Sequence, residues 1–109
     1  MNSNKLVEIT VEALEEIKAC DIKVLNVTQL TSMFEYIVIA SANSSRQTKA
    51  LANNVQEKVK GVGGSILSLE GEQTGEWLLV DLGDVVVHIM QPEVREYYNL
   101  EALWMSSMN

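Results

Sequence analysis

The sequence predicts an α/β domain with one mixed sheet of about five strands and helices packed mainly on one face. Hydrophobic residues alternate between helical and strand spacing along the chain, in the order α-β-β-α-β-β-β-α-α. The length of 109 residues gives room for one hydrophobic core. With one proline and no low-complexity run, the chain offers no linker. We therefore predict a single domain over residues 1–109.

The first half of the chain predicts two helices and two strands. Residues 4–19 have apolar side chains at helical spacing and acids on the opposite side, which is typical of an amphipathic helix. A strand rich in β-branched residues is expected at 22–27. The almost wholly apolar run 34–40 indicates a central strand covered on both faces. A capping box at Ser44 begins the next helix, predicted over 45–60.

The second half predicts three strands and two short helices. Glycines end the long helix, and a strand follows at 65–69. Two further strands, at 76–81 and 84–90, form a hairpin around a glycine turn. Pro92 opens a short helix at the first position, where proline is favoured. Asn99 is placed to cap a last helical turn.

The hairpin is the segment that points to function. If Val80 pairs with Val85, alternation puts only aliphatic side chains on one face. The other face then carries a mixed set: Trp77, Leu79, Asp81, Asp84, Val86, His88 and Met90. A slip of one residue would exchange the faces, so the register is an assumption.

A tryptophan among apolar and acidic neighbours is typical of an interaction hot spot. The alternative interpretation is that the last helices fold back and bury Trp77 against Tyr97, Tyr98, Leu103 or Trp104. The alternation of residues alone leaves both interpretations open.

The charge of the chain is concentrated in its second half. The net charge is −7, and residues 55–109 hold three Lys/Arg against nine Asp/Glu. Proteins that bind nucleic acid neutralise phosphates with Lys and Arg, so this half would repel a phosphate backbone. It would attract a basic protein at long range.

The spacing of the polar residues disfavours an enzyme. A mixed sheet with a Gly-Gly-Ser segment suggests a nucleotidyltransferase, but those enzymes need two carboxylates two residues apart on one strand. Asp81 and Asp84 are three apart, with a turn glycine between them. Together with His88 they are also too few for a metal site. Gly71 and Gly75 precede a strand, not a helix, so they indicate turns and not a phosphate loop. We predict no catalytic residue, cofactor or metal.

The chain is expected to be cytoplasmic. Its single cysteine, Cys20, rules out an intramolecular disulfide and suits a reducing compartment. Apolar runs are far shorter than the roughly 18 residues of a membrane helix. Glu8 and Glu12 stand where a signal peptide would be apolar.

Several spaced motifs resemble the Iojap-type ribosomal silencing factors. The resemblance runs from about Ile22 to Trp104. Its marks are Tyr36-Ile37-Val38-Ile39-Ala40, Ser44-Ser45-Arg46-Gln47, Glu70-Gly71-Glu72, Trp77, Val80-Asp81-Leu82-Gly83-Asp84-Val85-Val86-Val87-His88 and Arg95-Glu96-Tyr97-Tyr98-Asn99-Leu100-Glu101-Ala102-Leu103-Trp104.

The resemblance implies a fold like that of nucleotidyltransferases without their catalytic carboxylates. It implies a translation repressor that binds the large ribosomal subunit through its basic ribosomal protein number fourteen and blocks joining of the small subunit, with little direct nucleic-acid contact. The residues that it places at the partner interface are Trp77, Asp81, Leu82, Met90 and Tyr97, with Glu70 and Glu72 as rim charges. The alternatives are a nucleotide-binding or nucleotidyl-transferring enzyme and an adaptor for another basic protein. A homodimer off the ribosome is compatible with an apolar binding face.

Overall fold

The computed structural model describes residues 2–107, with side chains described as far as Met105. Its elements follow the predicted order. The helices are α1 (Ser3–Glu16), α2 (Ser45–Gly61), α3 (Pro92–Tyr98) and α4 (Leu100–Ser107). The strands are β1 (Cys20–Asn26), β2 (Tyr36–Ser41), β3 (Ser68–Glu70), β4 (Trp77–Asp81) and β5 (Val85–Met90).

The strands form one five-stranded sheet in the order β1-β2-β5-β4-β3. β2 and β5 pair in parallel, whereas the other neighbours are antiparallel. The sheet is therefore mixed, as predicted. The central position of β2 explains its apolar sequence, because both faces of this strand are covered.

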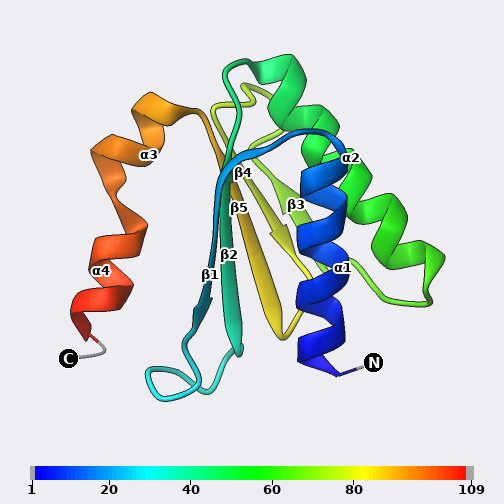
Figure 1. Ribbon diagram of the computed structural model, residues 1–109, viewed down its shortest axis with the longest axis vertical. Coiled ribbons are helices and arrows are strands. Elements are labelled where there is room, and N and C mark those ends of the chain that lie inside the picture. Colours follow the sequence, from blue (N-terminus) through cyan, green and yellow to red (C-terminus); the bar gives the residue numbers. More distant parts are fainter. Residues whose placement is uncertain (1, 108–109) are drawn as a thin grey trace.

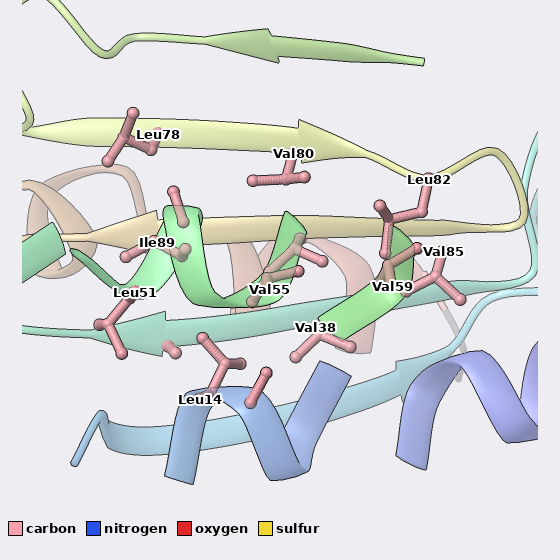
Figure 2. Close-up of a cluster of buried hydrophobic side chains, with 14 of the residues drawn as sticks. Leu14, Val38, Leu51, Val55, Val59, Leu78, Val80, Leu82, Val85 and Ile89 are labelled. Carbon is pink, nitrogen blue, oxygen red and sulfur yellow. The ribbon is translucent and has the colours of Figure 1, made fainter. Parts of the chain in front are cut away.

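The main hydrophobic core lies between the sheet and the two long helices (Figure 1). Figure 2 shows Leu14 from α1 and Leu51 from α2 approaching the aliphatic side chains of β2, β4 and β5. Alternate residues of the hairpin, such as Leu78 and Ile89, supply this core and are fully buried. The aliphatic face predicted from alternation is thus the core face.

The helix ends confirm the predicted caps. Ser44 Oγ accepts a hydrogen bond from the backbone N–H of Gln47 at 3.1 Å and starts α2. Asn99 has φ of 47°, ends α3, and accepts a hydrogen bond from the N–H of Ala102 in α4 through Oδ1 at 3.4 Å. Within residues 2–107, no helix is both long and apolar enough to span a membrane.

The two short helices lie on the opposite side of the sheet from α1 and α2 (Figure 1). We expected helices mainly on one face of the sheet, and the two long helices do share a face. The two short helices, which we call the C-terminal arm (α3 and α4), cover part of the other face. A second apolar cluster lies beneath the arm, and its buried members are Leu25, Val27, Ile37, Ile39 and Met90. Trp104 packs against Phe34 in an edge-to-face arrangement, with ring centroids 5.9 Å apart.

The hairpin register differs from the assumed one by two residues. Val80 pairs with Val87, not with Val85. The turn is centred on Gly83 and Asp84 because Gly83 takes φ of 94° and the N–H of Leu82 bonds the carbonyl oxygen of Val85 at 2.9 Å. An even shift leaves every side chain on its predicted face.

Candidate partner-binding surface

The arm covers only half of the second face of the sheet. The covered half belongs mainly to β1 and β2, where Ile37 and Ile39 are 1% and 0% exposed. The open half belongs to β3, β4 and β5. Val86 and Met90 of β5 are buried on this face, whereas Glu70 is exposed and four further side chains are partly exposed. We call these five residues the Trp77 strip, which consists of Glu70, Trp77, Leu79, Asp81 and His88.

Strand pairing brings the members of the strip together. Residues directly opposite each other in neighbouring strands share a face. Leu79 lies opposite Glu70 of β3 and His88 of β5, which makes one continuous row. Trp77 lies opposite Met90 at the end of the hairpin. A shallow pocket of about 180 Å³ opens on the strip, lined by Glu70, Gly71, Trp77 and Leu79.

His88 fixes the orientation of the Trp77 indole. Trp77 Nε1 donates a hydrogen bond to His88 Nδ1 at 3.0 Å, and the ring centroids are 5.9 Å apart. Burial lowers the pKa of His88 from 6.5 to about 4, so the imidazole is neutral at pH 7. Only the neutral ring can accept this bond, because both nitrogens of an imidazolium carry protons.

Acid is expected to destabilise the fold through His88. The pKa of His88 is lower in the folded chain than in the unfolded one, so its stabilising effect is complete above pH 6.5 and is lost as the pH falls towards 4. The lost free energy of unfolding is about 3 kcal/mol. His88→Asn keeps an acceptor for Trp77 without a titrating group. Urea unfolding at pH 7, 5.5 and 4.5 should show a shallower decline in the variant, and an identical decline would refute this role for His88.

The arm reaches the strip through two tyrosines. Tyr98 packs on Trp77 with ring centroids 4.8 Å apart, and Tyr97 meets Tyr98 at 5.1 Å in an edge-to-face arrangement. Trp77 remains half-buried, whereas Tyr97 is 82% exposed. Both interpretations of the sequence therefore hold in part: the arm covers one side of Trp77 and leaves the other side accessible.

The surroundings of the strip are acidic. Between Glu70 and Glu101 the sequence has eight acids and one base, Arg95. The structure buries Arg95, which is 8% exposed and paired with Glu101. The exposed charges of this stretch are therefore all negative, and they are Glu70, Glu72, Glu76, Asp84, Glu93 and Glu96. Such a surface favours a basic partner and opposes a phosphate backbone.

The loop between β3 and β4 is held by the start of α2. Thr48 Oγ1 donates to the carbonyl oxygen of Gly75 at 2.6 Å, and Ser45 Oγ donates to that of Thr74 at 2.7 Å. Gly71 and Gly75 have φ of 88° and 74°, which only glycine adopts readily. The two glycines are turn residues, as the sequence indicates. This anchored loop fixes Glu70 beside Trp77.

Most predicted interface residues gather on or beside the strip. Trp77, Asp81 and Glu70 belong to it, and Tyr97 joins it through Tyr98. Asp81 Oδ1 also accepts a hydrogen bond from the N–H of Gly83 at 2.9 Å, which stabilises the turn.

Three predicted residues lie elsewhere. Met90 is fully buried beneath the arm, and Leu82 is 7% exposed within the core on the other face. Glu72 is exposed but lines a cavity of about 540 Å³ between α2 and the β3–β4 loop, together with Lys49 and Gln56. The part of these three residues in partner binding stays a prediction.

Two contributors were missing from the predicted interface. Leu79 occupies the centre of the strip, and strict alternation from Trp77 was the signal that placed it on this face. Tyr98 covers one side of Trp77, a contact that the sequence offered only within the alternative interpretation of a buried Trp77.

The side chains of the strip include few groups that could bind a metal ion. Among the residues that the structure describes, no group of three His, Cys, Asp or Glu side chains is arranged to hold a metal ion. The Nδ1 atom of His88 is already engaged by Trp77. The strip offers an aromatic and aliphatic centre with a negative rim, which is the usual anatomy of a protein-binding site.

Comparison with known proteins gives a consistent result over the whole chain. The model of a family described as "ribosomal silencing factor during starvation" matches residues 1–109. A ribosomal silencing factor of Chromobacterium violaceum is 51% identical over 104 residues, which cover 95% of this chain and 85% of that protein. The corresponding protein of Bacillus subtilis is 36% identical over 104 residues, covering 95% of this chain and 88% of its own length.

A eukaryotic protein is also similar. The mouse protein named for mitochondrial assembly of the ribosomal large subunit is 34% identical over 101 residues, which cover 90% of this chain and 44% of that protein.

Solved structures share the fold. A crystal structure of a protein from Chromobacterium violaceum matches with a TM-score of 0.94 at 51% identity, covering 95% of this chain and 87% of the other. A crystal structure from Bacillus halodurans matches with a TM-score of 0.85 at 35% identity, covering 94% and 95%.

Proposed function

The chain belongs to the family of ribosomal silencing factors, and from this premise we propose that it represses translation by binding the large ribosomal subunit and sterically blocking the small one. As a member of the family it acts in ribosome-associated silencing of translation. The mouse relative carries the large subunit in its name, which supports this subunit as the partner.

The observation that carries the proposal is the Trp77 strip. Trp77 is half-buried and oriented by His88, so little conformational entropy remains to be lost on binding. Its accessible side lies within an acidic rim that has no exposed base between residues 70 and 101. Aromatic anchors in such surroundings dominate the energy of many interfaces.

The partner that fits this surface is a basic protein on the subunit. We propose the basic ribosomal protein number fourteen, at the face where the small subunit docks, because the family resemblance and the negative charge agree on it. The same charge disfavours direct contact with ribosomal RNA. Off the ribosome, the apolar side chains of the arm give a second copy of the chain a surface for pairing, and a cytoplasmic location follows from the partner.

No catalysis is required for this role. Binding alone excludes the small subunit if the bound protein occupies the joining face. The kinship with nucleotidyltransferases expected from the resemblance stays a prediction. Asp81 ends β4 and Asp84 lies within the turn, so the two carboxylates are not two residues apart on one strand, and this argues against nucleotide chemistry.

Co-sedimentation tests the binding step. The pure protein should pellet with isolated large subunits and not with small ones at low ionic strength. Binding should weaken at higher salt, because exposed charges are screened beyond a Debye length of about 8 Å at physiological ionic strength. No co-sedimentation with large subunits at low salt would overturn the proposal, and equal pelleting with small subunits would show the attraction to be unspecific.

A further inference from the structure

The C-terminal arm is held to the sheet by few contacts. α3 has seven residues and α4 has eight, so neither helix is long enough to be stable without tertiary packing. Asn99 joins them in the left-handed conformation, which makes a sharp bend between the two helices. Leu100 and Trp104 are partly buried against the second apolar cluster, whereas Leu103 is 63% exposed.

One largely buried ion pair crosses the bend. Arg95 of α3 directs Nε and Nη2 at Glu101 Oε2 in α4, each at 3.2 Å. The Nη1 atom of Arg95 donates to Ser41 Oγ at 2.8 Å, at the buried end of β2. A single guanidinium therefore links both helices of the arm to the end of β2.

The geometry of the Arg95–Glu101 pair indicates that it positions the arm more than it stabilises the fold. Glu101 Oε1 is buried and has no hydrogen-bond partner in the described part of the chain. A buried pair with an unsatisfied oxygen gives little net stability, because desolvation offsets the attraction. Its best-attested use is to fix one arrangement among several that apolar packing would allow equally well.

The arrangement that it fixes includes the aromatic side of the strip. Tyr98 lies three residues after Arg95, so the side chains of the two residues are neighbours on α3. Tyr98 packs on Trp77, and Tyr97 packs on Tyr98. A rotation or shift of α3 would uncover Trp77 and move Tyr97 away from the strip.

We propose that Arg95 and Glu101 are positioning residues for the partner-binding surface: their link to Ser41 sets the arm so that Tyr98 braces Trp77 and Tyr97 faces the partner. The inference rests on the proposed function for its binding readout only. Neither side chain is expected to contact the partner, since side-chain exposure is 10% for Arg95 and 19% for Glu101.

Apolar replacement of the pair separates positioning from direct contact. In a Trp104→Phe background Trp77 is the single tryptophan. Three variants are made in it: Arg95→Met, Glu101→Leu, and the two together. Each single change leaves one buried charge without its partner, which is strongly disruptive, whereas the double change leaves an apolar pair. Acrylamide quenching of Trp77 reports on the arm without any ribosome, and co-sedimentation with large subunits reports on binding.

Each single change should increase the quenching of Trp77 and weaken binding at least tenfold. The double change should bring both the quenching of Trp77 and the binding affinity most of the way back to the parent values. If the double variant binds as weakly as the worse single variant although its quenching is restored, the charges themselves contact the partner and the inference fails. Unchanged quenching in both single variants would also overturn it.

Two safeguards keep the test decisive. If a single variant does not melt cooperatively, Glu101→Gln replaces it, since it removes the charge while keeping the shape and one acceptor oxygen. If the parent protein fails to bind large subunits while the single variants still loosen Trp77, the proposed function fails and the positioning of the arm stands.

Discussion

Replacing Trp77 with alanine and Asp81 with lysine together should weaken binding to large subunits about a hundredfold or more. Loss of a tryptophan anchor alone costs about 2 kcal/mol or more at an interface, which is roughly thirtyfold in affinity. Reversal of a rim charge adds to this against a basic partner. Titrated co-sedimentation measures the change. Trp77 is half-buried at the margin of the second cluster, so the variant should still melt cooperatively.

A matched control carries the same kinds of change on the other side of the sheet. Val62 is 52% exposed and lines a small groove between α1 and α2 together with Glu12. Val62→Ala with Glu12→Lys also removes an apolar side chain and reverses an acid. This control should bind as the parent does. Equal binding by the Trp77 variant would show that the strip is not the binding surface.

Replacing Gly71 with alanine should lower both stability and binding. A Cβ at Gly71 would lie 1.9 Å from the carbonyl oxygen of Trp77, and the residue has φ of 88°. The atoms that the Cβ would clash with belong to the backbone and not to a mobile side chain, so β3 and β4 would have to move apart. We expect a loss of about 2–4 kcal/mol in the free energy of unfolding and a midpoint lower by about 10–20 °C.

Gly61→Ala is the control for this change. Gly61 is the last residue of α2, and a Cβ added there would have no atom within 4 Å. Alanine favours a helix over glycine, so this variant should be as stable as the parent or slightly more so. Thermal unfolding followed by circular dichroism compares the two. A Gly71 variant as stable as the Gly61 variant would contradict the close approach of the loop to β4.

The faces of the hairpin were predictable because side chains alternate along a strand and an even shift in register leaves each of them on the same face. The pairing of Val80 was wrong by two residues, yet Trp77 and His88 still share a face. Alternation gives no account of where a glycine turn is centred, since Gly83 can take either central position of a tight turn. Alternation also does not predict how deeply a side chain is buried. Met90 lies on the predicted face but is completely buried.

The position of the arm could not be predicted for a different reason. It depends on contacts between residues far apart in the sequence, such as Arg95 with Ser41 and Trp104 with Phe34. The sequence indicates that α3 and α4 form, through Pro92 and Asn99, but not which surface they cover. Whether Trp77 is buried or free therefore stayed open until the structure showed Tyr98 on one side of its ring.

Burial of Arg95 changes which charges of the acidic second half reach the surface. Arg95 is a positive charge in the sequence but contributes none to the surface, because Glu101 and Ser41 enclose its guanidinium. Glu101 is neutralised in the same pair, so the net charge of this stretch is unchanged, but every fully exposed charge between residues 70 and 101 is negative. This uniform sign favours a basic partner and predicts binding that weakens as salt increases.

The most direct test of steric silencing is the joining of purified subunits, followed by light scattering or by sedimentation on a sucrose gradient. Large subunits saturated with the protein should fail to join small subunits, and the inhibition should follow their occupancy. The variant with Trp77→Ala and Asp81→Lys should allow normal joining at the same concentration. Undiminished joining by large subunits that demonstrably carry the protein would contradict the account.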